Sequence, residues 1–129
     1  VRYAEQLGIS EAVKFHGFSS EIHKIMAESA IYVSSSDYEG ISNSMLEALA
    51  IGIPAVCTDC PVGGARMYIR DGENGYLIPV GDADVMADRM LALMEDKKLG
   101  ESFSKESVKI REELTDDRIF GMWKALLVR

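Results

Sequence analysis

Short apolar runs alternate with amphipathic stretches over the first two thirds of the chain. The apolar runs predict four strands, at residues 13–15, 30–33, 53–57 and 76–79. Between them, apolar residues spaced by three or four predict helices over residues 21–28, from residues 42–44 to Gly52, and over 65–69. Strands that alternate with helices predict an α/β fold, a parallel Rossmann-like sheet with helices on both faces.

The last third of the chain predicts helices alone. Its apolar residues form three stripes at helical spacing, which are Met86, Met90, Leu93 and Met94; then Phe103, Ser107, Ile110 and Leu114; then, after an N-cap at Thr115, Ile119, Met122, Trp123 and Leu126. We interpret the stripes as packing faces. A methionine-rich surface for a partner is the alternative.

The polar turn before the second helix has the composition of a ligand site. Gly40 allows a close backbone approach, and Ser42, Asn43 and Ser44 are all good N-caps, so free N–H groups should converge there. Such a helix start attracts phosphate. One turn further on, the Glu47 carboxylate could accept hydrogen bonds from both hydroxyls of a ribose.

Glu39 lies before the same turn. It would face whatever is attached to the far end of a bound diphosphate, so the stretch predicts a nucleotide-sugar site. The alternative for Glu47 is structural: Ser44-x-x-Glu47 is also the pattern of a capping box, in which serine and glutamate bond each other's backbone N–H groups.

Composition limits the classes of partner. With 129 residues, 47% hydrophobic and 27% charged, the chain is one small domain or a piece of a larger protein, and Val1 as its first residue favours a piece. A net charge of −7 without a basic cluster argues against nucleic acid and against direct contact with an anionic membrane. There is no signal-peptide pattern and no apolar run of about 18 residues, so we expect a cytoplasmic protein.

The two cysteines, Cys57 and Cys60, stand in a Cys-x-x-Cys pattern. Zinc would need two further ligands, and His16 and His23 lack the spacing of a zinc module. A redox pair normally begins a helix, whereas these cysteines follow a predicted strand. We therefore expect two reduced thiols and no metal.

Three linked segments carry a resemblance to a known family. Residues 36–54 (SDYEGISNSMLEALAIGIP), with Glu39 and Glu47 separated by seven residues, closely resemble the nucleotide-binding segment of the group 1 (family 4) retaining glycosyltransferases. The similarity continues through residues 58–64 (TDCPVGG) and 71–79 (DGENGYLIP), in the family's order. The chain departs from the family pattern at Ser35, Ser42 and Met67.

The resemblance implies the donor-binding, C-terminal domain of a metal-independent GT-B enzyme, covering residues 1–129 and incomplete. Its substrate would be a nucleotide sugar, a UDP-sugar ahead of a GDP-sugar, with no cofactor. Glu47 would bind the ribose, and His16 would lie near the base. Glu39 would contact the sugar as nucleophile or, as we favour, as electrostatic stabiliser. The diphosphate would bind at Gly40, Ile41, Ser42, Asn43 and Ser44.

The remaining parts of such an enzyme would lie outside these residues. The resemblance implies that a basic clamp, a general base and the site for a glycan or lipid-linked acceptor come from elsewhere, the last from an N-terminal domain. The chain alone should then be inactive. The implied setting is bacterial polysaccharide assembly in the cytoplasm, at the inner membrane through the other domain.

Three further expectations concern the sheet, a pair of glycines and the function class. The first two strands of the family's domain are missing, so strands 13–15 and 30–33 should either pair directly or leave an open sheet edge. Gly63 and Gly64 form a simple connection or let a backbone approach the donor. The alternative function is a non-catalytic phosphate- or nucleotide-binding module, with Asp59 as a poor candidate for a phosphorylated aspartate.

Overall fold

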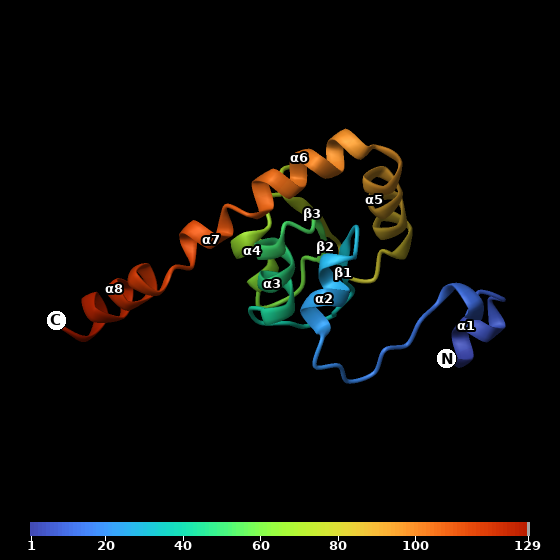
Figure 1. The fold of residues 1–129 in the computed structure, drawn as a ribbon, viewed down its shortest axis with the longest axis horizontal. Coiled ribbons are helices and arrows are strands. Elements are labelled where there is room, and N and C mark those ends of the chain that lie inside the picture. Colours follow the sequence, from blue (N-terminus) through green and yellow to red (C-terminus); the bar gives the residue numbers. More distant parts are fainter. Residues whose placement is uncertain (129) are drawn as a thin grey trace.

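The computed structural model describes residues 1–128 and contains a parallel three-stranded sheet. The strands are β1 (Tyr32–Ser34), β2 (Ala55–Thr58) and β3 (Gly75–Ile78), in the spatial order β1-β2-β3 (Figure 1). In the register, Ala55 of β2 is opposite Tyr32 on one side and Gly75 on the other. The predicted parallel α/β fold is confirmed.

Helices connect and cover these strands. They are α1 (Arg2–Gln6), the 3-10 helix η1 (Ser10–Ala12), α2 (Ile22–Ala27), α3 (Asn43–Ile51), α4 (Gly64–Tyr68), α5 (Ala83–Glu95), α6 (Lys97–Ser107), α7 (Ile110–Glu113) and α8 (Asp116–Leu127). Helix α3 joins β1 to β2, and α4 joins β2 to β3, which are the crossovers that a parallel sheet needs. No helix in residues 1–128 is long and apolar enough to cross a membrane.

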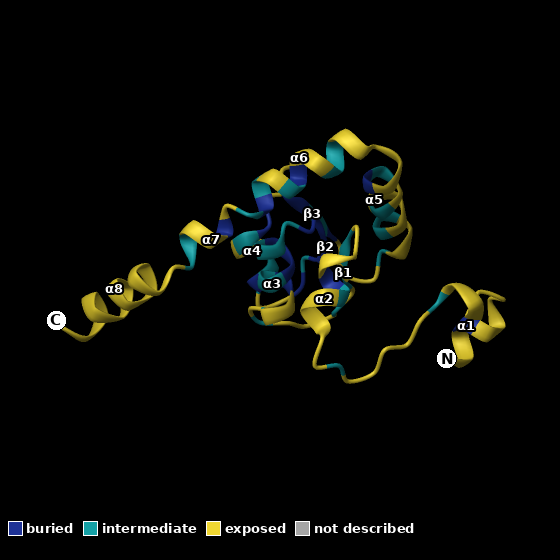
Figure 2. Ribbon diagram, viewed as in Figure 1, coloured by how far each residue is buried: buried dark blue, intermediate teal, exposed yellow. Residues whose placement is uncertain are grey.

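The central strand β2 supplies core to both faces of the sheet, because alternate side chains of a strand point to opposite sides. Ala55 and Cys57 belong to one buried cluster with Met45, Leu49, Ile69 and Ile110. Val56, on the other face, belongs to a second cluster with Ile78, Leu93 and Phe103. Figure 2 shows this buried centre between the helices.

The three predicted helical stripes differ in how far they are buried. Leu93, Phe103, Ser107 and Ile110 are buried, and the Ser107 hydroxyl donates to the Asn74 carbonyl at 3.0 Å. Met94, in contrast, is 65% exposed. Helix α8 begins at the predicted cap Thr115, yet it contains no buried residue, so its apolar stripe is not part of the core in residues 1–128.

The predicted strand at residues 13–15 is wrong. Val13 has extended backbone angles, but this segment joins no ladder and runs away from the body toward α1 (Figure 1), with Phe15 exposed. A β-strand is stabilised by backbone hydrogen bonds to a neighbouring strand, and no strand lies beside residues 13–15 to form them. The sheet therefore has three strands instead of about four, and of our two expected outcomes the open edge, at β1, is the one observed.

Candidate functional site

The polar turn after β1 leads directly into α3 at the carboxyl edge of the sheet. Ser42 is the N-cap of α3: its hydroxyl accepts a hydrogen bond from the Met45 N–H at 3.4 Å, and its carbonyl accepts one from the Leu46 N–H at 3.1 Å. Ser44 is therefore already inside the helix. The alternative for Glu47, a capping box with Ser44, is not formed, because the N-cap is Ser42 and the N3 position that a capping-box glutamate would occupy is Met45.

The helix start presents unpaired backbone donors. Within residues 1–128, the N–H groups of Ser42, Asn43 and Ser44 have no hydrogen-bond acceptor. Three N–H groups at the positive end of a nine-residue helix favour an anion there. The structure thus brings together the amides that the sequence suggested for a phosphate.

A chain of hydroxyl groups fixes the side chains at this helix start. The Tyr32 hydroxyl, from β1, lies 2.7 Å from the Ser44 hydroxyl, which lies 3.0 Å from that of Ser42. Because the Ser42 oxygen also accepts from the Met45 N–H, the sheet is connected to the cap through three side chains. The first turn of α3 is therefore held in one arrangement.

A second turn, at residues 61–64, holds the backbone of Glu39. The Glu39 N–H donates to the Pro61 carbonyl at 2.8 Å, and the Val62 N–H donates to the Glu39 carbonyl at 3.1 Å. At Gly64 a Cβ atom would lie 1.9 Å from the Gly40 oxygen, so only glycine fits. The absence of a side chain at Gly64 therefore allows close contact with the backbone of Gly40 in the polar turn.

The two glutamates differ in their surroundings. The Glu39 side chain is exposed and has no ion-pair or hydrogen-bond partner among residues 1–128. The Glu47 side chain is 44% exposed, and its Oε2 lies 3.3 Å from Nε2 of His23 in α2. His23 was absent from the predicted site residues. The signal that could have found it is its spacing of three from Met26, which places both on one face of the helix that precedes β1.

Other titratable groups near the turn are occupied or buried. Asp59 pairs with Arg66, whose Nε donates to Oδ1 at 2.9 Å, and this hydrogen bond, with the attraction of the carboxylate charge, raises the pKa of Arg66. Cys57 and Cys60 are buried free thiols, and burial raises the pKa of Cys57 to about 12. In the described part of the chain, no group of three or more His, Cys, Asp and Glu side chains could hold a metal ion.

His16 is not brought to the helix start. It lies in the extended segment before α2, where it lines a hollow with Lys14, Ser19 and Lys24, among others. That hollow shares no residue with the one beside Glu39 and Ser42.

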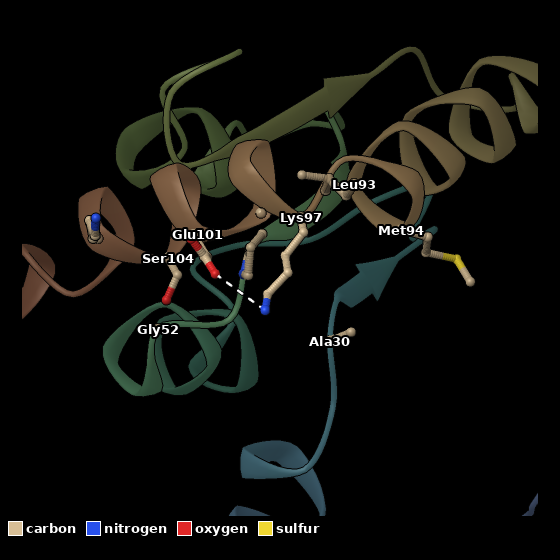
Figure 3. Close-up of a pocket in the computed structure, with 10 residues that line it drawn as sticks. Ala30, Gly52, Leu93, Met94, Lys97, Glu101 and Ser104 are labelled. Carbon is tan, nitrogen blue, oxygen red and sulfur yellow. Dashed lines mark ion pairs between the residues drawn. The ribbon is translucent and has the colours of Figure 1, made fainter.

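The polar turn has no deep pocket beside it. The one lined by Glu39, Gly40 and Ser42 has a volume of about 10 Å³, too small for a nucleotide. A hollow of about 720 Å³ lies at the other end of the strands, where the chain enters β1 and β2. It is lined by Ala30, Gly52 and the ion-paired Lys97 and Glu101, among others (Figure 3). A ligand of the polar turn would therefore lie on an open surface and outside the larger hollow.

Comparison with known proteins identifies the family. The sequence model of the family "Glycosyl transferases group 1" matches residues 1–109. EpsD of Bacillus subtilis (strain 168) is 37% identical over 128 residues, which are 96% of this chain and 33% of EpsD. The chain thus spans about a third of the length of this relative.

Solved structures agree in fold. A crystal structure of a S. aureus TarM mutant in complex with fondaparinux, alpha-GlcNAc-glycerol and UDP matches with a TM-score of 0.89 and 30% identity, over 97% of this chain and 25% of that one. The C-terminal domain of LpcC, a group 1 family protein from Francisella tularensis, matches with a TM-score of 0.74 and 26% identity, over 88% and 58% of the two chains. The chain belongs to the group 1 glycosyltransferases.

Proposed function

We propose that residues 1–129 are part of the C-terminal, donor-binding domain of a retaining GT-B glycosyltransferase. The likeness to the C-terminal domain of LpcC supports this position in a larger protein. The UDP bound in the TarM crystal supports a UDP-sugar, ahead of a GDP-sugar, as the donor.

The observation that carries the proposal is the arrangement around the start of α3. Three unpaired N–H groups, at residues 42–44, lie one helical turn before a carboxylate that the cap does not use. The amides would bind the diphosphate, with Gly40 and Ile41 in the same turn. Glu47, which is half-exposed, would accept hydrogen bonds from the ribose hydroxyls.

Glu39 would act on the sugar. Its backbone is held by the turn at residues 61–64, while its side chain has no partner among the described residues and is free to face a ligand. A carboxylate at that place would stabilise the positive charge that develops on the sugar ring as the bond to the diphosphate breaks. We assign it this electrostatic role.

The acceptor would be a glycan or lipid-linked sugar, bound by a domain outside these residues, in polysaccharide assembly on the cytoplasmic side of the membrane. The basic groups that neutralise the leaving diphosphate would also come from outside. We assign no metal and no cofactor to the reaction. The chain alone should transfer no sugar.

Titration of the ¹⁵N-labelled chain with UDP in the presence of EDTA tests this function. We expect shifts of the amide resonances of residues 42–44, tighter binding of UDP than of GDP, and about tenfold or greater weakening in Glu47→Ala, since hydrogen bonds to a charged group contribute about 1.5–3 kcal/mol. The matched control is Glu95→Ala, at an exposed position in the last turn of α5.

Two results would overturn the proposal. One is equal affinity of the wild type and Glu47→Ala for UDP. The other is magnesium-dependent phosphorylation of Asp59, which would favour the non-catalytic module; the ion pair of Asp59 with Arg66 argues against it.

A further inference from the structure

The contact between α2 and α3 brings a second side chain to the ribose carboxylate. Nε2 of His23 lies 3.3 Å from Oε2 of Glu47, within ion-pair range. We propose that His23 is a positioning residue for donor binding, which acts by holding the Glu47 carboxylate in place. This inference rests on the function proposed above, in which Glu47 binds the ribose.

The position of His23 is set by a buried contact. Met26 lies three residues after His23, on the same face of α2, and it is buried in a cluster with Ala48 and Ile53. Ala48 immediately follows Glu47 in α3 and is fully buried. Because this packing fixes the two helices against each other, it also directs His23 toward Glu47.

The other basic side chain of α2 lies elsewhere. Lys24 lines the hollow that also contains Lys14 and His16, on the side of the N-terminal segment. Within residues 1–128, the one basic side chain within ion-pair distance of Glu47 is His23, and the contact is an ion pair when the imidazole is protonated. His23 is therefore the basic group of α2 that can restrain this carboxylate.

Such a restraint leaves the carboxylate able to bind a diol. An ionised carboxylate has about four acceptor positions, and the imidazole approaches Oε2 only, so the positions on Oε1 stay free for the ribose. A glutamate held before binding loses less rotamer freedom when the ribose arrives, so affinity rises without a direct contact from His23 to the ligand. Both side chains are partly exposed, at 67% for His23 and 44% for Glu47, so the effect is modest.

The test compares two ligands of the same surface. UDP contains the ribose, whereas pyrophosphate lacks it and would contact the amides alone. By NMR titration of the chain, we expect His23→Ala to weaken UDP binding about two- to fivefold, the range for an exposed ion pair, and to leave pyrophosphate binding unchanged. His23→Gln, which keeps N–H groups but carries no positive charge, should recover part of the loss. Lys24→Ala, which removes a charge from the same helix, should change neither ligand.

A double mutant separates positioning from a general effect on the fold. In a Glu47→Ala background, His23→Ala should cause no further loss of UDP affinity, because the group through which it acts is gone. A further loss there, or equal weakening of UDP and pyrophosphate in the single mutant, would refute the inference. So would unchanged UDP affinity in His23→Ala while Glu47→Ala still weakens binding, and this result would leave the proposed function standing. A chain whose UDP affinity does not depend on Glu47 would overturn both.

Discussion

Gly64→Ala tests the contact that holds the proposed catalytic turn. An added Cβ atom would lie 1.9 Å from the oxygen and 2.4 Å from the carbon of the Gly40 carbonyl, and 2.8 Å from the Ile41 nitrogen. All three atoms are backbone and cannot rotate away. The turns must therefore separate until the shortest contact reaches about 3.0 Å, the lower limit for Cβ atoms.

The cost follows from this separation. Overpacking by one methyl group in a well-packed site destabilises by about 1–3 kcal/mol. The same movement stretches the two hydrogen bonds between Glu39 and residues 61–62, now 2.8 and 3.1 Å long, and each contributes about 0.5–1.5 kcal/mol. For a domain of this size we expect the melting temperature to fall by about 3–12 °C.

Thermal unfolding followed by circular dichroism measures the effect. The matched control is Gly100→Ala in α6, where the added Cβ would lie at an ordinary 3.6 Å from the Leu93 carbonyl oxygen, and where the better helix propensity of alanine should leave the protein as stable or more so. A melting temperature of Gly64→Ala within about 1 °C of the wild type would show that the turns are not in close contact, and the role assigned to Gly64 would be refuted.

Three further predictions concern stability. Ser42→Ala should destabilise by about 0.5–2 kcal/mol in urea unfolding because it removes the cap of α3, whereas a neutral effect would place the cap elsewhere. Tyr32→Phe should lose about 0.5–1.5 kcal/mol in the same assay because the Ser44 hydroxyl loses the nearer of its two hydroxyl partners, at 2.7 Å; no change in stability would show that this hydrogen bond does not stabilise the fold. Stability should fall as pH rises above 9 toward 12, because the Cys57 thiol ionises near 9.0 when unfolded and near 12 when folded, and Cys57→Ala should flatten this slope.

Local patterns in the sequence were sufficient for most secondary structure. The apolar run at residues 53–57 predicted the central strand, and the helical stripe of Phe103, Ser107 and Ile110 predicted part of the core. Both predictions are confirmed, because the spacing of apolar residues along an element indicates which face it buries. Thr115 was recognised as a cap for the same reason. The spacing of Glu39 and Glu47 indicated the family, and the roles of both in the reaction remain predictions.

The tertiary structure decided features that depend on residues far apart in the chain. Serine at either position 42 or 44 is a good cap, and the observed start of α3 at Ser42 goes together with the bond from Ser44 to Tyr32 of β1. The need for glycine at position 64 comes from the Gly40 carbonyl, twenty-four residues earlier in the chain.

The same reason explains what the sequence alone left open or predicted wrongly. Residues 13–15 have the composition of a strand, but a strand needs a hydrogen-bonded neighbour, and this segment does not pair with the free edge of β1. His23 is an ordinary surface residue in the sequence and meets Glu47 only because Met26 packs α2 against α3. Local patterns thus predicted most of the elements, and the resemblance of three segments indicated the family, whereas contacts between elements decided which groups hold the proposed site.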